Sequence, residues 1–243
     1  MKEKGICFIH TVNGLVDMFT TLSRELIPGG KLCHIVDETL IQRVLAAGGL
    51  TPAIYRRVAE HAAAAEQNGA AVIQLTCSSI SPCADTIRQM VSVPVLKVDE
   101  AMVEMAVGKY RKVGIIATAP TTLKPSTDLV FQKAGARQDP IEVESVLCEG
   151  AFDAFLAGRV DEHDKIVRGR LLDLMNKVEV VLLAQASMKR IADALEEKGK
   201  KVPVLSSPRL AVERLASILA SPQPKLGIVS SADNVRQKGD KTR

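Results

Sequence analysis

Short apolar runs alternate along the chain with longer segments in which apolar residues recur every three or four positions. The runs predict strands at 5–10, 32–36, 71–76 and 93–96, and again at 112–117, 141–147, 179–184 and 202–205. The segments between them predict helices at 13–26, 52–68, from 82 onward, 99–107, 121–134, 161–176, 188–198 and 208–220. Asp37 and Glu38 follow a strand and are expected in a solvated loop. Regular alternation of strand and helix indicates parallel sheets covered by helices on both faces.

The second half of the chain repeats the first. Gly5 recurs as Gly114 within similar apolar runs, and the string VPV at 93–95 recurs at 202–204, both 109 residues later. The apolar run that ends at Thr76 matches the run at 180–184, which puts Cys77 opposite Gln185. Each match is weak alone, but several in the same order at nearly one spacing indicate an internal duplication.

The duplication predicts an α/β protein with two pseudo-symmetric, Rossmann-like parallel-sheet domains. We expect residues 1–97 with about 208–225 in the first domain, residues 98–207 in the second, and a polar tail at 226–243. Ligands of open parallel sheets bind beyond the carboxyl ends of the strands. Two such units facing each other therefore predict an active site between the domains.

Composition narrows the functional classes. Aromatic residues make up 3% of the chain, too few for the stacking platforms of nucleic-acid-binding proteins. Half of the net charge of +4 lies in the tail at 233–243, where Arg236, Lys238, Lys241 and Arg243 outnumber Asp233 and Asp240. No apolar run has membrane-spanning length, and the opening MKEKG begins a strand rather than a signal peptide. We expect neither nucleic acid nor membrane as a partner.

The five cysteines are scattered and have no metal-ligand spacing, so the sequence predicts no metal site. Their odd number fits a reducing cytoplasm better than a disulfide framework. We therefore expect a cytoplasmic protein. The assembly state stays open, a homo-oligomer included.

Cys77 is the strongest candidate for chemistry. It ends a buried apolar run, and Ser78, Ser79 and Ser81 before Pro82 are typical of a helix start. A helix N-terminus favours a thiolate over a thiol, which would make Cys77 a nucleophile or a base. The alternative is a small buried core cysteine, the usual role of a free cysteine.

Other polar residues follow the same strand ends. They are His10 and Asn13 after the first strand, Ser78 and Ser79 beside Cys77, Thr118, Thr121 and Thr122 in the second half, and Gln185 with Ser187 opposite Cys77. Hydroxyls, amides and helix starts without a cluster of cations suit a carboxylate better than a polyphosphate. Neither half carries GxGxxG or GxxxxGK, so the phosphate cradle of nucleotide sites is missing.

Three strings carry a family resemblance: TCSSISP at 76–82, GIIATAPTTLKPS at 114–126 and VVLLAQASM at 180–188. With the duplicated plan, they make residues 4–220 resemble the aspartate/glutamate/hydantoin racemase superfamily, which includes arylmalonate decarboxylase and maleate isomerase. The resemblance implies a cofactor-independent, metal-free enzyme that acts on a small carboxylate. It also implies one cysteine from each half, which remove and return a proton beside the carboxylate, and a carboxylate site at Thr118, Thr121 and Thr122. Cys77 matches the first cysteine.

The second cysteine of that pattern is replaced by Gln185. An amide is not a general acid or base near neutral pH, so symmetric two-thiol racemisation is in doubt. Three alternatives remain open. In the first, the protein is a racemase or isomerase and His10 supplies the second proton-transfer group. In the second, it is a decarboxylase of a substituted malonate, which needs only Cys77. In the third, it binds a carboxylate without turnover.

Overall fold

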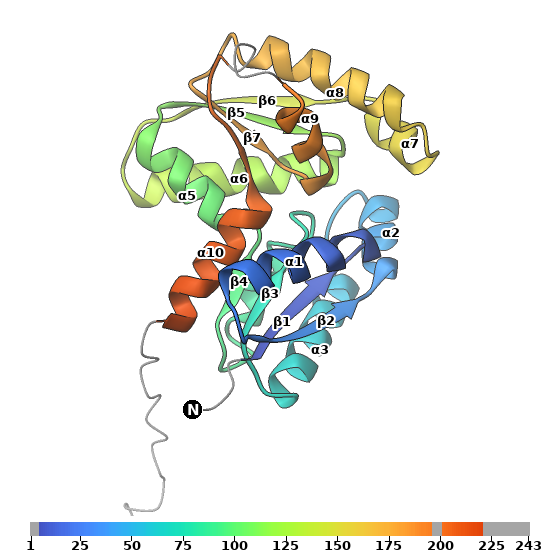
Figure 1. The fold of residues 1–243 in the computed structure, drawn as a ribbon, viewed down its shortest axis with the longest axis vertical. Coiled ribbons are helices and arrows are strands. Elements are labelled where there is room, and N and C mark those ends of the chain that lie inside the picture. Colours follow the sequence, from blue (N-terminus) through green and yellow to red (C-terminus); the bar gives the residue numbers. More distant parts are fainter. Residues whose placement is uncertain (1–4, 196–200, 221–243) are drawn as a thin grey trace, which may run out of the picture.

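The structure, a computed structural model, describes residues 5–195 and 201–220. Two four-stranded sheets, parallel throughout, form its two halves (Figure 1). The first has the order β2-β1-β3-β4, built from Lys31–Val36, Gly5–His10, Ala70–Leu75 and Val95–Lys97. The second has the order β6-β5-β7-β8, built from Glu142–Leu147, Lys112–Ala117, Val180–Leu183 and Val204–Ser206. Equivalent strands occupy equivalent places, which confirms the predicted α/β fold with two pseudo-symmetric domains.

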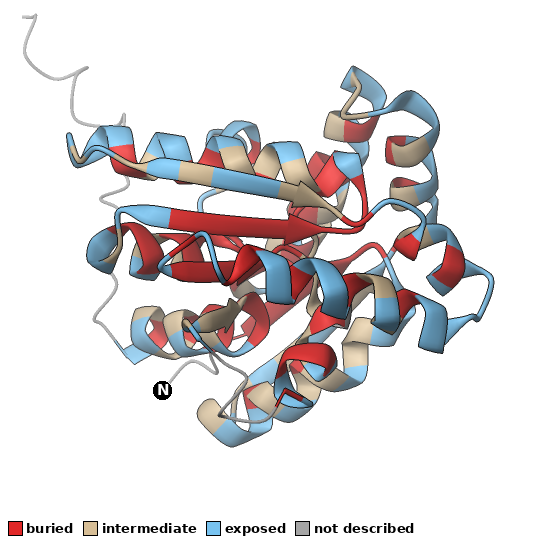
Figure 2. Ribbon diagram, turned by 90° about the horizontal axis from the view of Figure 1, so that it is seen from above, coloured by how far each residue is buried: buried red, intermediate tan, exposed pale blue. Residues whose placement is uncertain are grey.

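Helices cover both faces of each sheet. The central strands β1, β3, β5 and β7 are largely buried, whereas the edge strands β2 and β6 are partly exposed (Figure 2). On the first sheet, one face carries α2 (Glu38–Ala47), α3 (Pro52–Gln67) and α4 (Cys83–Ile87), and the other carries α1 (Val16–Leu26) and α10 (Ser207–Ala220). On the second sheet, one face carries α5 (Glu100–Lys109) and α6 (Pro120–Ala136), and the other carries α7 (Ala151–Leu156), α8 (Val160–Leu174) and α9 (Lys189–Asp193). The short 3-10 helices η1 (Asn13–Leu15) and η2 (Ala186–Met188) follow β1 and β7.

The alternation of side chains along β1 assigns its residues to two cores. Ile6 and Phe8 pack under α1 and α10, whereas Cys7 and Ile9 pack under α2 and α3. All four are fully buried. Because side chains alternate along a strand, His10 lies on the face of Ile6 and Phe8, a position that matters for the site.

Two equivalent glycines permit close packing in both domains. A β-carbon on Gly5 would lie 2.8 Å from the carbonyl oxygen of Gly69, just before β3. A β-carbon on Gly114 would lie 3.0 Å from side-chain carbons of Leu174 and Val178. Each glycine therefore lets the first strand of its domain pack closely. Gly5 approaches the backbone just before β3, and Gly114 approaches side chains of α8 and of the loop before β7.

The two domains exchange one helix each. α5 follows β4 of the first sheet but packs in the core of the second, and α10 follows β8 of the second sheet but packs in the core of the first. The two exchanged helices contact each other, and Arg214 of α10 pairs with Glu104 of α5. Lys133 of α6 bonds Glu104 and Glu100 of α5, at 2.7 Å each.

The structure corrects three local expectations. α4 begins at Cys83 and has five residues, because successive tight turns occupy residues 77–82 before it. Cys77 is therefore not at a helix N-terminus. α2 occupies the place of the expected loop, with Asp37 as its N-cap accepting from the Thr39 N–H at 3.1 Å. α7 is a further helix that the hydrophobic pattern did not predict.

Candidate active site

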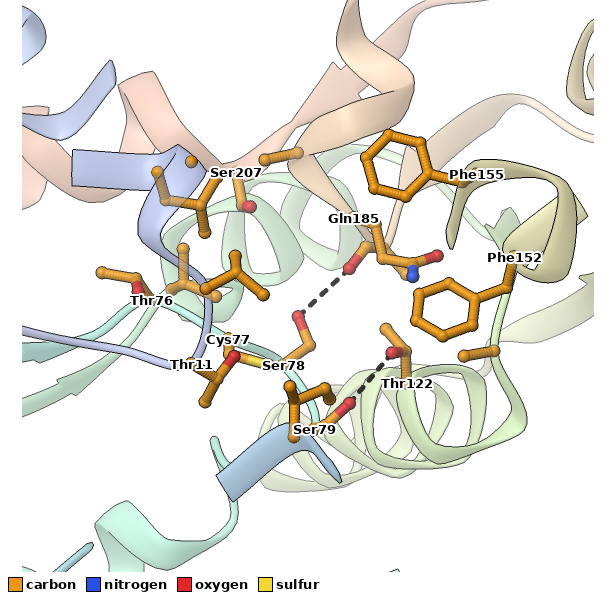
Figure 3. A pocket seen from close by; sticks show the side chains of 18 of the residues that line it. Thr11, Thr76, Cys77, Ser78, Ser79, Thr122, Phe152, Phe155, Gln185 and Ser207 are labelled. Atoms are coloured by element: carbon orange, nitrogen blue, oxygen red, sulfur yellow. Dashed lines mark hydrogen bonds between the residues drawn. The ribbon is translucent and has the colours of Figure 1, made fainter. Parts of the chain in front are cut away.

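A cavity of about 800 Å³ lies between the two domains. Its lining includes residues that directly follow the strands of both sheets, namely Thr11, Thr76 to Ser79, Val98, Ala119, Ala184 to Ala186 and Ser207. The cavity is thus at the carboxyl ends of the strands, where the fold class predicts it. Figure 3 shows its polar side chains converging from both domains.

Cys77 lines this cavity and is half-buried. Cys7, Cys83 and Cys148 are fully buried, and burial raises the pKa of these thiols to about 12, about 12 and about 11 respectively. Cys33 is exposed but is not among the residues that line the cavity. Cys77 is therefore the only cysteine of the described residues in a position to meet a ligand there.

The loop of residues 76–82, which we call the Cys77 loop, presents backbone donors beside the thiol. Within the described part of the chain, no group accepts a hydrogen bond from the N–H groups of Cys77, Ser78 or Ser79. Buried N–H groups are nearly always paired, so donors left free at a cavity are suited to a bound oxygen atom.

The serine side chains of the same loop hold the domains together. Ser78 Oγ donates to the carbonyl oxygen of Ala184 at 3.2 Å, and Ser79 Oγ lies 3.0 Å from Thr122 Oγ1 (Figure 3). Ser79 and Thr122 are both buried. These hydroxyls are thus hydrogen-bonded across the domain interface.

Gln185 lines the cavity from the second domain, at the place equivalent to Cys77. Its Oε1 accepts from the Thr118 N–H at 2.7 Å and from the Thr118 hydroxyl at 2.9 Å. A backbone N–H can only donate, so the atom that meets it is the amide oxygen. The Gln185 NH₂ group is therefore left as a donor at the cavity wall, between Phe152 and the Ser78–Ala184 hydrogen bond (Figure 3).

His10 does not reach the cavity. Its side chain is fully buried, stacks on the ring of His34 and packs against the tilted ring of Phe19. Its Nδ1 lies 2.9 Å from Thr76 Oγ1, and its Nε2 lies 2.9 Å from His34 Nδ1. Burial, and secondarily the proximity of His34, lowers the pKa of His10 to about 4. The expectation that this imidazole serves as a proton-transfer group in the cleft is not met.

The remaining predicted residues divide into those at the cavity and those behind it. Thr122 lines the cavity, whereas Thr118 acts behind Gln185 and Thr121 is buried with an Oγ1 that has no partner among the described residues. Asn13 is exposed outside the lining, and its N–H donates to Glu38 at 3.1 Å. The side chain of Ser187 lies outside the described part of the structure, as do residues 221–243.

A buried carboxylate supports the Cys77 loop from behind. Asp99 is 1% exposed, and its Oδ1 accepts from Ser81 Oγ at 3.1 Å. Its Oδ2 has no partner within the described residues. Burial raises the pKa of Asp99 to about 6, although hydrogen bonds and Lys97 oppose this shift.

The apolar residues that line the cavity away from Cys77 were not predicted from the sequence. They come from the two helices that were not predicted, Ile41 and Leu45 from α2, and Phe152, Phe155 and Leu156 from α7. A signal for α2 was present, because Asp37 followed by apolar residues at 40, 41, 44 and 45 is a capped amphipathic pattern. The six residues of α7 are too few for a reliable periodicity.

Among the described residues, no group of three or more His, Cys, Asp or Glu side chains is arranged to hold a metal ion. No helix within those residues has the length and apolarity that crossing a bilayer requires.

Comparisons with known proteins agree with this geometry. The sequence model of the family described as Asp/Glu/Hydantoin racemase matches residues 16–215. Glutamate racemase from Francisella tularensis, solved with D-glutamate, is similar in structure, with a TM-score of 0.72 and 19% identity over 90% of this chain and 81% of that one. A search among curated proteins gives no match.

Two further solved structures have the same fold. Allantoin racemase from Klebsiella pneumoniae has a TM-score of 0.65 and 19% identity, over 90% of this chain and 88% of that one. The aspartate racemase of Picrophilus torridus has a TM-score of 0.64 and 14% identity, over 88% of this chain and 94% of that one. At these identities the structures establish the shared fold, and the family model, which spans most of the sequence, establishes membership. The chain belongs to the Asp/Glu/Hydantoin racemase family.

Proposed function

We propose that the protein is a cofactor-independent, racemase- or isomerase-like enzyme that transfers a proton at the carbon beside the carboxylate of a small acid. The observation that carries the proposal is the position of Cys77, whose half-buried thiol lines the cavity between the duplicated domains. Free backbone donors adjoin it, and Gln185 occupies the equivalent place in the other domain.

In this reaction Cys77, as thiolate, takes the proton as the C–H bond breaks. The electron pair passes into the carboxylate to form an enolate. Return of a proton by the same thiol restores the original acid with exchange of its proton, whereas delivery of a proton to the opposite face of that carbon inverts it. The N–H groups of Ser78 and Ser79 and the NH₂ group of Gln185 are the donors available for the enolate oxygens. Donors fixed in place before the charge develops are the usual source of such stabilisation.

The burial of His10 favours a second candidate, a decarboxylase. Racemisation requires proton transfer on both faces of the planar intermediate. Gln185 is an amide and cannot transfer a proton, and His10 is buried behind Thr76. A decarboxylase needs a single proton donor. The bond to the departing carboxylate breaks, CO₂ leaves, the electron pair forms the enolate of the remaining carboxylate, and the Cys77 thiol protonates it.

Incubation of candidate acids in D₂O tests the proposal. Cys77-dependent incorporation of deuterium at the carbon beside the carboxylate supports it. Loss of optical activity without release of CO₂ supports the racemase. Stoichiometric release of CO₂ with a single-enantiomer product supports the decarboxylase. If acids that bind in the cavity show neither deuterium exchange nor release of CO₂, the protein is a carboxylate-binding protein and not an enzyme of this kind.

A further inference from the structure

One side of the cavity is apolar and is built by elements on both domains. Met18 of α1 and Ile41 and Leu45 of α2 come from the first domain, and Phe152, Phe155 and Leu156 of α7 come from the second. Phe155 is 40% exposed and Leu156 is 66% exposed. Large apolar side chains that gather at a cavity while remaining open to solvent are typical of a surface that a ligand covers.

The aromatic residues of α7 face the cavity although the core lies on the opposite side of the same helix. Ala151 and Ala154 are fully buried and belong to the core under the second sheet. Phe152 and Phe155 instead extend toward Gln185 (Figure 3). A helix that served stability alone would turn its large apolar groups toward the core and present polar groups on the opposite face. The reversed arrangement indicates that α7 is shaped for a ligand.

The helix is held in this position by its surroundings. It lies between Gly150 and Gly158, whose φ angles of 76° and 72° allow the sharp changes of direction at its two ends. It contacts α8 extensively, and the ring of Phe155 lies 5.4 Å from the His163 ring of α8. The apolar wall is therefore preformed.

The charges at the cavity disfavour a second carboxylate on the substrate. Among the described lining residues the charged side chains are Glu38 and Arg190. Arg190 is engaged by both carboxylate oxygens of Asp164, with its Nε at 3.2 Å from Oδ2. Glu38 would repel an anion. The side-chain carboxylate of aspartate or glutamate would thus lie against apolar side chains and near Glu38. Among the described lining residues the cation is Arg190, which is already paired with Asp164, so the cost of desolvating that carboxylate would not be compensated.

We propose that the substrate carries an uncharged, apolar substituent, aromatic or branched aliphatic, on the carbon beside its carboxylate, and that α2 and α7 bind this substituent. The inference rests on the proposed function and names the substrate class for the same site. The cavity of about 800 Å³ is well above the space that a four- or five-carbon amino acid fills and leaves room for such a group.

Matched pairs of acids test the inference. Phenylalanine is compared with glutamate, and benzylmalonate with carboxyethylmalonate, because each pair differs only in the substituent. We expect kcat/KM for exchange or CO₂ release to favour the apolar member by about tenfold or more. A preference for the charged members would overturn the inference while leaving proton transfer at Cys77 intact.

Protection of Cys77 from iodoacetamide gives a readout that does not depend on turnover. We expect the apolar acids to protect at lower concentrations than the charged acids, and Phe155→Ala to weaken that protection about tenfold. Phe131→Ala is the matched control, because Phe131 is also half-exposed but lies on α6 outside the cavity lining. Equal effects of the two variants, or no protection by any apolar acid, would overturn the inference even where the enzyme turns over another substrate.

Discussion

Thr118 fixes Gln185 by two hydrogen bonds to one atom, from its N–H at 2.7 Å and from its hydroxyl at 2.9 Å to Gln185 Oε1. The duplicated position that would carry a second thiol thus carries an oriented NH₂ donor. We predict that Gln185→Leu, which removes this donor but keeps the bulk, lowers kcat/KM by about tenfold or more. Thr118→Val retains the N–H bond and should show a smaller loss. Steady-state kinetics measure both, and a Thr118→Val loss larger than that of Gln185→Leu would contradict the role given to the amide.

Thiol labelling tests the accessibility of Cys77. In a Cys33→Ser background, limiting iodoacetamide should label Cys77 ahead of Cys7, Cys83 and Cys148, because those three are fully buried and their pKa values are raised by burial. Peptide mass spectrometry locates the label. Preferential modification of a buried cysteine in the folded protein would be incompatible with the site.

The hydroxyl pair between Ser79 and Thr122 should couple the domains energetically. The two oxygen atoms are 3.0 Å apart and buried, so Ser79→Ala or Thr122→Val leaves a buried hydroxyl without its partner. We expect a coupling free energy of about 1 kcal/mol in a double-mutant cycle on unfolding by urea. Strict additivity of the two substitutions would show that the interface is open in solution.

The buried imidazole of His10 should make stability depend on pH. Its pKa falls from 6.5 to about 4 on folding, so the unfolded chain binds more protons between these values and stability is lost as pH falls through that window. From pH 7 to pH 5 the loss should be about 2 kcal/mol larger in the wild type than in His10→Gln.

Asp99 acts in the opposite direction, because its pKa is raised on folding to about 6 and its cost to stability declines as pH falls. Since both proteins contain Asp99, this contribution cancels in the comparison with His10→Gln. Equal pH profiles for the two proteins would contradict the burial of a neutral His10. Titration of the wild-type imidazole signals by NMR provides the same check without a substitution.

The sheets could be predicted from sequence because their central strands are nearly continuous apolar runs and because the second domain repeats the first. All four residues of β7 are buried, for example, and the equivalent β3 has only Gln74 as a polar residue. The predicted limits of the two domains stay a prediction.

The candidate site could be predicted only in part. Cys77 and Gln185 follow strand ends, and the parallel arrangement alone brings such positions together. Alternation with Phe8 along β1 turns the His10 side chain into the core, a direction that its position at the strand end does not reveal. The apolar wall escaped prediction because helices as short as α7 have too few residues to display a period.

Deuterium exchange with matched cysteine variants shows directly whether Cys77 carries the proton. Amino acids, hydantoins, hydroxy acids and substituted malonates are incubated in D₂O with the wild type, with Cys77→Ala and with Cys33→Ala. Cys33 serves as the control because its thiol is exposed but outside the cavity lining. We predict deuterium at the carbon beside the carboxylate with the wild type and with Cys33→Ala, and none with Cys77→Ala. Undiminished incorporation with Cys77→Ala would rule out Cys77 as the group that transfers the proton.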